Sequence, residues 1–394
     1  MNRVFLFLAF ILISFVVYGF YISQFEFSLI NKNESPSIYS TRLFYDYKMS
    51  LNIYTNLSTG SGNPYSIAHE AKKSRLDYIL LSDTNMITDL EHDHYISSVG
   101  VLFAQKINFN DQPYIIYSPS TKDTLSSQTN DLFNPQMDKL IIAAHPINKS
   151  FSYHELQNTA IDGVEVINLK SVIQKSWQFS KLSTIWSLIY YPFNPRLALM
   201  RLYNDPIDEI LLFDKLSQEK KISFFIGSEA TARAIPFANW LIKFPSYESS
   251  FSIASQHILL PSELTGDIST DNRKIVDALK KQRSYVAFDA LGDSNGFEVY
   301  VGDKNKKYFL GDTIEYTKSL TLYYKLPSEP NAFYEVVLYK NGIRLDHMNT
   351  FQGLFKINSP GIYRIQVRLS PRFPLPDAIK WISWIYTNNF YITE

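Results

Sequence analysis

The stretch that decides the fold is LNIYTNLSTGSGNPYSIAHEAKKSRLDYILLSD, residues 51–83. Its apolar run at 51–54 predicts a strand, and residues 64–73 predict a helix that starts with a proline. A second apolar run at 78–82 predicts the next strand. Strand, helix and strand in this order form the repeating unit of a parallel α/β sheet or barrel.

Further apolar runs predict strands at 140–144, 164–167 and 223–226. Each run is followed by a polar residue: His145, Asn168 and Ser228. In parallel barrels the chemistry is built at the carboxyl ends of the strands. We therefore predict a distorted (β/α) TIM-like barrel with a polar site at one end.

The pattern changes after Pro261. A helix is predicted inside residues 267–284, followed by strands at 297–301, 320–325, 334–339 and 362–369. The pair Asn341-Gly342 is typical of a tight hairpin turn. These features predict an all-β sandwich domain.

The N-terminus holds a run without charge from Phe5 to Ile22, preceded by Arg3. This run is long enough to cross a bilayer, and no small-x-small cleavage site follows it, so we favour an anchor over a cleaved signal. Positive charge before the run places the N-terminus in the cytoplasm and the body outside, in the periplasm or beyond the cell. The predicted organisation is anchor or signal 1–23, linker 24–43, barrel 44–266, connecting helix 267–284 and β-sandwich 285–394.

The composition narrows the chemistry. The 394 residues include 38 basic and 38 acidic side chains, so no net field would attract nucleic acid. There is no cysteine, which excludes disulfides and thiolate metal sites. Histidine and carboxylate ligands remain. We expect the membrane as a partner, and leave a small-molecule or protein partner open.

Four motifs with fixed order mark the predicted strand ends. They are Asn52-Ile53-Tyr54-Thr55, Ser82-Asp83-Thr84-Asn85, Ala144-His145-Pro146 with Asp162-Gly163-Val164-Glu165-Val166-Ile167-Asn168, and Gly227-Ser228-Glu229-Ala230-Thr231. In this order they resemble the PHP (polymerase and histidinol phosphatase) superfamily, in particular its extracellular-type members with an appended β-sandwich. The resemblance implies a metal-dependent phosphoesterase framework.

Most ligands that the resemblance implies are missing. Asn52 and Tyr54 stand at the paired histidines, Thr84 and Thr231 at two others, and Gln105 or Lys106 at an expected glutamate. Amides and hydroxyls are weak ligands for Zn, Mn or Fe. The surviving ligand types are Asp83, His145 and Glu229, while Glu165 and Asn168 match the family pattern.

Two functions from different classes follow. The first is a pseudo-enzyme that serves as a binding or scaffolding module and needs no cofactor. The second is a residual metal-dependent hydrolase of phosphoesters or related esters with one divalent ion on Asp83, His145 and Glu229. A variant of the first would bind a sugar or phosphate through Asn52, Tyr54, Thr84 and Thr231.

Two other segments leave alternatives open. The cluster Glu91-His92-Asp93-His94 has metal-like spacing, but a charged run in a loop indicates a solvated surface. The segment 171–203 is rich in aromatic and basic residues, which fits either a helical pair packed on the barrel or an amphipathic element on the membrane. We favour the packed pair.

Overall fold

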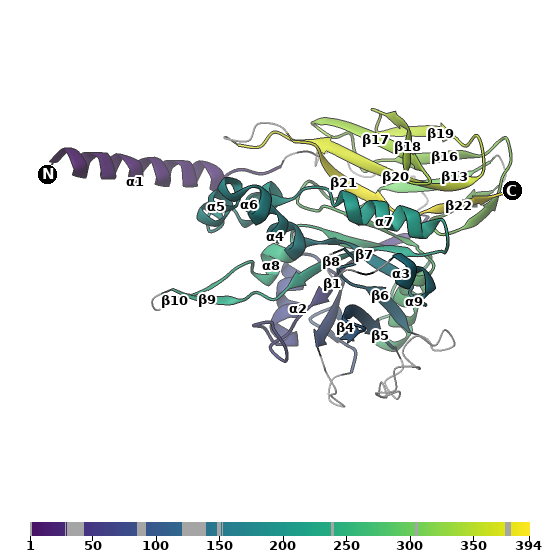
Figure 1. Ribbon diagram of the computed structural model, residues 1–394, viewed down its shortest axis with the longest axis horizontal. Coiled ribbons are helices and arrows are strands. Elements are labelled where there is room, and N and C mark those ends of the chain that lie inside the picture. The colour runs from purple at the N-terminus through teal and green to yellow at the C-terminus, as the bar shows by residue number, and fades with distance from the viewer. Residues whose placement is uncertain are drawn as a thin grey trace.

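The computed structural model describes residues 2–27, 29, 43–84, 92–119, 139–147, 151, 153–237, 240–303, 306–374 and 380–394. In this part of the chain, helix α1 (Asn2–Ser23) projects from a body that consists of a barrel and a second, β-rich part (Figure 1). Most of the predicted linker lies outside the described residues.

Seven strands form a closed ring in the order β1-β2-β4-β5-β6-β7-β8, because β8 also pairs with β1. They are β1 (Tyr45–Ile53), β2 (Tyr78–Thr84), β4 (Val99–Phe109), β5 (Gln112–Tyr117), β6 (Leu140–Ala143), β7 (Gly163–Asn168) and β8 (Ser223–Ala230). The five predicted barrel strands are all present, with shifts only at their ends. The prediction of an α/β barrel is confirmed in outline.

The ring is mixed rather than fully parallel, which corrects the prediction. Strand β5 runs antiparallel to both neighbours. Asn110 and Asp111 connect β4 to β5 with φ values of 50° and 62°, the conformation of a two-residue hairpin turn. Such a short turn can only join antiparallel strands.

Helices cover the barrel and reach the base of α1. They are α2 (Pro64–Lys73), α3 (Tyr153–Asn158), α4 (Leu169–Phe179), α5 (Lys181–Tyr190), α6 (Pro195–Leu202), α7 (Ile207–Ser217), α8 (Tyr247–Phe251) and α9 (Ile268–Lys280). The predicted first helix is α2, which begins where the Asn63 side chain accepts a hydrogen bond from Ser66 N at 2.8 Å. The predicted connecting helix is α9.

The barrel sheet continues into the C-terminal part. From β1 it runs through β11 (Ser255–Leu260), β12 (Ser284–Ala287), β21 (Ile382–Thr387), β20 (Gly361–Ser370) and β22 (Phe390–Thr393) to β15 (Thr313–Glu315). Strand β17 (Phe333–Lys340) pairs with β20, and β18 (Ile343–Met348) pairs with β17 through a hairpin turn at the predicted Asn341-Gly342. The same sheet thus belongs to both parts of the body.

A second sheet packs against this C-terminal extension. It contains β14 (Lys307–Tyr308), β13 (Glu298–Gly302), β16 (Thr321–Lys325) and β19 (Gln352–Lys356). Val301 and Leu322 of this sheet share one hydrophobic core with Val336 and Val367 of the large sheet. Each strand predicted after residue 285 is present.

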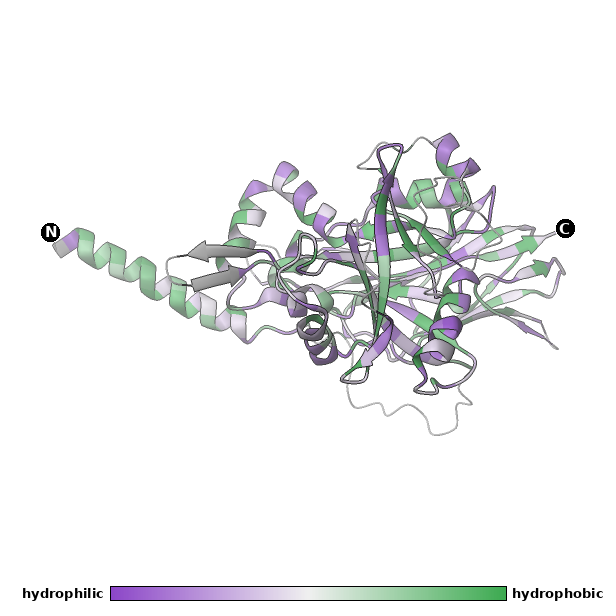
Figure 2. Cartoon of the chain, turned by 90° about the horizontal axis from the view of Figure 1, so that it is seen from below, coloured by the Kyte–Doolittle hydropathy of each residue, from purple (hydrophilic) through white to green (hydrophobic). Residues whose placement is uncertain are grey.

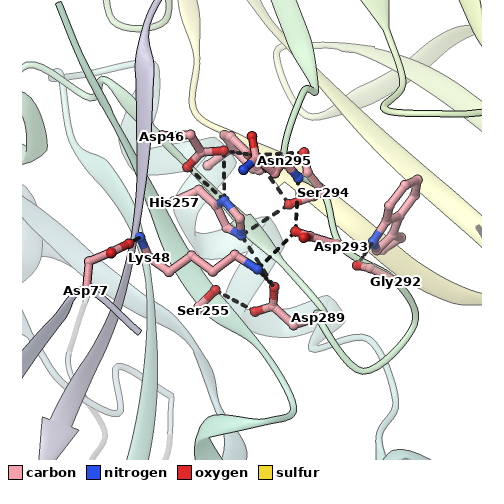
Figure 3. Close-up of polar contacts among 12 residues, drawn as sticks. Asp46, Lys48, Asp77, Ser255, His257, Asp289, Gly292, Asp293, Ser294 and Asn295 are labelled. Atoms are coloured by element: carbon pink, nitrogen blue, oxygen red, sulfur yellow. Dashed lines mark hydrogen bonds and ion pairs between the residues drawn. The ribbon is translucent and has the colours of Figure 1, made fainter. Parts of the chain in front are cut away.

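Buried charges tie β1 and β11 to the loop that follows β12 (Figure 3). The His257 ring lies between two carboxylates, with Nδ1 at 2.9 Å from Asp46 Oδ1 and Nε2 at 3.7 Å from Asp289 Oδ1. Lys48 Nζ contacts Asp289 at 2.6 Å and Asp293 at 3.0 Å. We call these five residues the His257 cluster.

Two residues of the His257 cluster, His257 and Asp289, have shifted pKa values. Burial alone would lower the pKa of His257, but the charges and hydrogen bonds of Asp46 and Asp289 outweigh it and raise the pKa to about 9. Burial would raise the pKa of Asp289, but His257 and Lys48 hold it well below its ordinary value. His257 and Asp289 are therefore both ionised at neutral pH.

Helix α1 is apolar along almost its whole length, as Figure 2 shows by hydropathy. Residues 3–23 are long and apolar enough to cross a membrane, a property that signal sequences share. Its C-terminal end packs on the body, where the Asn194 side chain donates hydrogen bonds to Ile22 O at 3.0 Å and Phe25 O at 2.8 Å. The predicted N-terminal apolar helix is confirmed as a helix.

Candidate functional site

The candidate site lies inside the ring of strands, where the quoted motifs end β1, β2, β7 and β8. The pairing of β1 with both β2 and β8 shifts register between residues 50 and 53, and Asn52 has a φ of 58°. The fully buried Asn52 side chain donates to Glu165 Oε1 at 2.7 Å and accepts from Ser82 Oγ at 3.2 Å. Asn52, which stands at the first implied histidine position, therefore uses its side-chain amide in hydrogen bonds to other protein side chains.

Lys106 of β4 places its ammonium among the degenerate ligand positions. Its Nζ lies 2.7 Å from Tyr54 OH, 3.2 Å from His145 Nε2 and 3.3 Å from Asn52 Oδ1. The side chain is buried, with 6% of the residue exposed. An ammonium only donates, so Tyr54 OH and Asn52 Oδ1 accept from it, while the role of His145 Nε2 depends on the protonation of that ring. The protein thus holds the ammonium of a lysine inside the ring, among the positions where the resemblance implies metal ligands.

Two of the three surviving ligand types meet beside Lys106. His145 Nε2 lies 3.2 Å from Glu229 Oε2, and Lys170 Nζ contacts Glu229 Oε1 at 2.9 Å. Burial would raise the pKa of Glu229, but the charges of His145, Lys106 and Lys170 outweigh it and lower the pKa. Glu229 is therefore a carboxylate that is already neutralised by side chains.

Tyr54 takes part as a neutral phenol. Burial, followed by the nearby carboxylates of Glu229, Glu165 and Asp83, raises the pKa of Tyr54 far above its ordinary value. Its hydroxyl accepts a hydrogen bond from Lys106. A phenol that stays protonated at all physiological pH values is a poor metal ligand.

The third surviving ligand type, Asp83, serves the loop after β1. Asp83 Oδ1 accepts from Thr55 N at 2.8 Å, Oδ2 accepts from Thr55 Oγ1 at 2.7 Å, and Ser58 Oγ donates a further hydrogen bond to Oδ1. These bonds fix the strand-to-helix loop and use both carboxylate oxygens. Asp83 is committed to local structure, as the capping role of aspartate predicts.

The remaining predicted residues occupy separate positions. Gln105 precedes Lys106 on β4 and points to the opposite face, because successive side chains of a strand alternate. Thr84 ends β2, and the carbonyl of Thr231 accepts a hydrogen bond from Ser61 N at 3.0 Å. The Asn168 side chain caps α4 by accepting from Ser171 N at 2.8 Å.

The residues present do not fit a metal ion. Within the described ranges, no group of three or more histidine, aspartate and glutamate side chains is arranged to hold one. The donor set explains this: a fixed ammonium repels a divalent cation and already uses Asn52, Tyr54 and His145. No reaction step through a metal follows from this geometry.

In the segment Glu91-His92-Asp93-His94, Asp93 makes hydrogen bonds that hold the local structure. Asp93 Oδ1 accepts from Phe103 N at 2.9 Å, and Asp93 Oδ2 accepts from Asn272 Nδ2 at 2.9 Å and from Tyr117 OH. Glu91 lies outside the described residues. Asp93 thus fastens the start of β3 (His94–Ile96) to the barrel, which differs from the solvated surface that we predicted.

A cavity of about 350 Å³ opens beside His145 and Glu165, between α4 and the start of α7. Two buried polar atoms of its lining residues, Asn168 Nδ2 and Glu209 Oε2, have no hydrogen-bond partner in the described part of the chain. Buried polar groups are normally paired, so such atoms mark a place where a ligand can supply the partner. No motif in the sequence pointed to Glu209.

Comparison with protein families and with curated proteins gives no match for this sequence. Among solved structures, the chain is similar to the crystal structure of a two-domain protein containing a predicted PHP-like metal-dependent phosphoesterase from Bacteroides vulgatus ATCC 8482. The sequence identity is 11%, the TM-score is 0.35, and the match covers 86% of this chain and 95% of the other. The motifs predicted a resemblance to this type of protein.

Proposed function

We propose that this protein is an exported, membrane-anchored pseudo-enzyme that acts as a binding module. Residues 44–266 form its distorted barrel of PHP type and residues 285–394 its β-sandwich, with α1 as an uncleaved anchor. The observation that carries the proposal is Lys106, whose ammonium lies where the implied ligand positions converge. The ammonium of Lys106 offsets the charge of nearby carboxylates such as Glu229, as a metal ion would, but it cannot supply the chemistry of a metal ion.

The alternative of a single-metal hydrolase requires a different arrangement. Asp83 would have to give up its hydrogen bonds to Thr55 and Ser58 before it could join His145 and Glu229. The ammonium of Lys106 would also have to leave His145. Both changes leave a buried charge without its present partners, which costs several kcal/mol.

Metal uptake tests the choice between these two functions. The full chain in detergent, dialysed against Zn²⁺, Mn²⁺ or Fe²⁺ and then against metal-free buffer, is expected to retain far less than one ion per chain by elemental analysis. The physical reason is the repulsion between Lys106 and a divalent ion. Stoichiometric metal that disappears in Asp83→Ala or His145→Ala would overturn the pseudo-enzyme.

The polar groups that line the cavity beside His145 indicate which class of small molecule it would bind. It needs an acceptor for Asn168 Nδ2 and a donor for Glu209 Oε2, and a hydroxyl group can be either. Its walls carry Glu165, Asp205, Asp208 and Glu209 against Lys175 and His145, which disfavours phosphate or another anion. We infer that the bound molecule is a neutral polyhydroxylated compound of about monosaccharide size.

Replacing Asn168 by aspartate tests this ligand site, because Asn168→Asp keeps the oxygen that caps α4, removes the unpaired donor and adds one negative charge. We expect wild-type protein to bind one of glucose, galactose or myo-inositol in calorimetric titration. Binding to Asn168→Asp should be about tenfold weaker or more, since an unpaired buried group costs about 1–3 kcal/mol.

The matched control is Asn204→Asp, which adds the same charge to the exposed wall of the cavity and leaves Asn168 intact. It should bind the same compound with little change. An equal loss in both variants, or no binding of any of the three compounds to wild-type protein, would contradict the proposed ligand site.

A further inference from the structure

Helices α5 and α6 lie at the base of α1, as Figure 1 shows. Aromatic rings make this contact. The Phe15 ring lies 5.4 Å from that of Tyr190 and 5.7 Å from that of Phe193, and the Tyr18 ring lies 5.0 Å from Tyr190. A side chain at Gly19 would collide with Phe193, so the two segments approach closely.

The contact lies well inside the segment that would cross the membrane. Phe15 is eight residues before Ser23, and at about 1.5 Å per residue the contact extends about 12 Å along α1 from its end. An element packed at that level of a bilayer-spanning helix lies below the surface of the bilayer, because the hydrocarbon region of the bilayer must cover α1. The C-terminal end of α5 is therefore at the level of lipid.

Helix α5 also has its polarity reversed relative to a helix of a soluble protein. Its exposed positions are apolar, with Leu182 84% exposed, together with Ile185, Leu188 and Ile189. Its buried positions are hydroxyl-bearing, with Thr184 3% and Ser187 1% exposed. A soluble helix buries its apolar stripe and exposes its polar face. The reversed order is that of a helix whose outer surroundings are apolar.

Neighbouring features extend the same face. Phe179, at the end of α4, is 85% exposed, and two charged residues are also exposed: Lys181, the first residue of α5, and Arg196, near the start of α6. Cationic side chains at the edge of an apolar face favour anionic lipid headgroups. The hairpin of β9 (Ala234–Phe237) and β10 (Trp240–Lys243), apolar in sequence except for Lys243, projects on the same side as α1 (Figure 1).

From the contact with α1 and the reversed polarity, we propose that the exposed face of α5, with Phe179, is inserted into the lipid leaflet that surrounds the C-terminal end of α1. The occupant of this face is lipid, with anionic headgroups beside Lys181 and Arg196. The body then lies against the bilayer at a fixed orientation instead of hanging from a free tether. This proposal rests on α1 as a membrane anchor, and it replaces the packed helical pair that the sequence favoured.

Spin labels test the depth of this face without background, because the chain has no cysteine. The full chain is reconstituted into nanodiscs of zwitterionic and anionic phosphatidyl lipids, with one nitroxide at Leu182→Cys or Ile185→Cys. Labels at Leu12→Cys, in α1, and at Ile343→Cys, 73% exposed on β18, serve as membrane and aqueous references. Power saturation compares collisions with oxygen, which concentrates in lipid, and with a water-soluble nickel chelate.

We expect the oxygen-to-nickel ratio at positions 182 and 185 to exceed that at 343 and to approach that at 12. Aqueous ratios at 182 and 185 with a lipid ratio at 12 would overturn the insertion and leave the anchor intact. An aqueous ratio at 12 would overturn the anchor and the insertion together. Protection from both reagents at 182 would indicate a protein partner and would also overturn the proposal.

Discussion

Replacement of Lys106 by methionine is expected to lower the free energy of unfolding by about 1–3 kcal/mol, because buried acceptors lose their donor. The substitution keeps the length of the side chain but removes the charge that faces Tyr54, His145 and Asn52. Glu229 would keep Lys170, but the interior of the ring would lose its buried cation. The measurement is denaturant unfolding of the full chain in detergent, followed by tryptophan fluorescence.

Lys170→Met is the matched control. Lys170 also contacts Glu229, at 2.9 Å, but its side chain is 40% exposed. Solvent screens such a pair, so this variant should lose less than about 1 kcal/mol. Equal losses in the two variants would show that the position of Lys106 inside the ring has no special energetic role, and the proposed substitution of cation for metal would fail.

Raising the pH from about 6.5 to above 9 is expected to cost the fold free energy of the order of 3 kcal/mol through His257 alone. The pKa of His257 is raised to about 9 in the folded protein, against 6.5 for a free imidazole. The folded state therefore holds a proton that the unfolded chain releases in this range. The stabilisation is complete below pH 6.5 and is lost as the pH rises through 9.

At acid pH the fold loses stability through Asp289, because its pKa is lowered in the folded protein, whereas that of His257 is raised. Its contribution is complete above the ordinary carboxyl pKa of about 4 and declines as the pH falls further. Unfolding at a series of pH values should thus show a maximum between about 4 and 6.5. In His257→Asn the decline between 6.5 and 9 should flatten, and an unchanged slope in that variant would refute the assigned pKa.

Local patterns in the sequence predicted the elements well, because strands and helices are encoded by periodicity over a few residues. The helix at residues 64–73 and the turn at Asn341-Gly342 are examples. The β4–β5 hairpin was missed, although Asn110-Asp111 between two apolar runs is a turn signal. The mixed direction of the barrel depends on that one turn.

The sequence predicted which metal ligands are missing from the site, but it did not predict that the Lys106 side chain stands among their positions. Reading Asn52, Tyr54 and Thr84 against the motifs showed which ligands were absent. Whether Gln105 or Lys106 faces inward depends on the register of β4, and a shift of one residue exchanges the two faces of a strand. His257 and Asp46 are 211 residues apart, so no local pattern could have linked them.

The strand pairing of β12 with β21 has a consequence for how the protein is made. β12 ends at Ala287, but its partner β21 begins only at Ile382, so the two strands are far apart in the order of synthesis. Until then β12 keeps an open hydrogen-bonding edge, the kind of edge that attracts other chains. The sheet stays incomplete until residues 382–387 have been made. A chain that has been made as far as the barrel but not as far as β21 therefore needs protection from pairing with other chains.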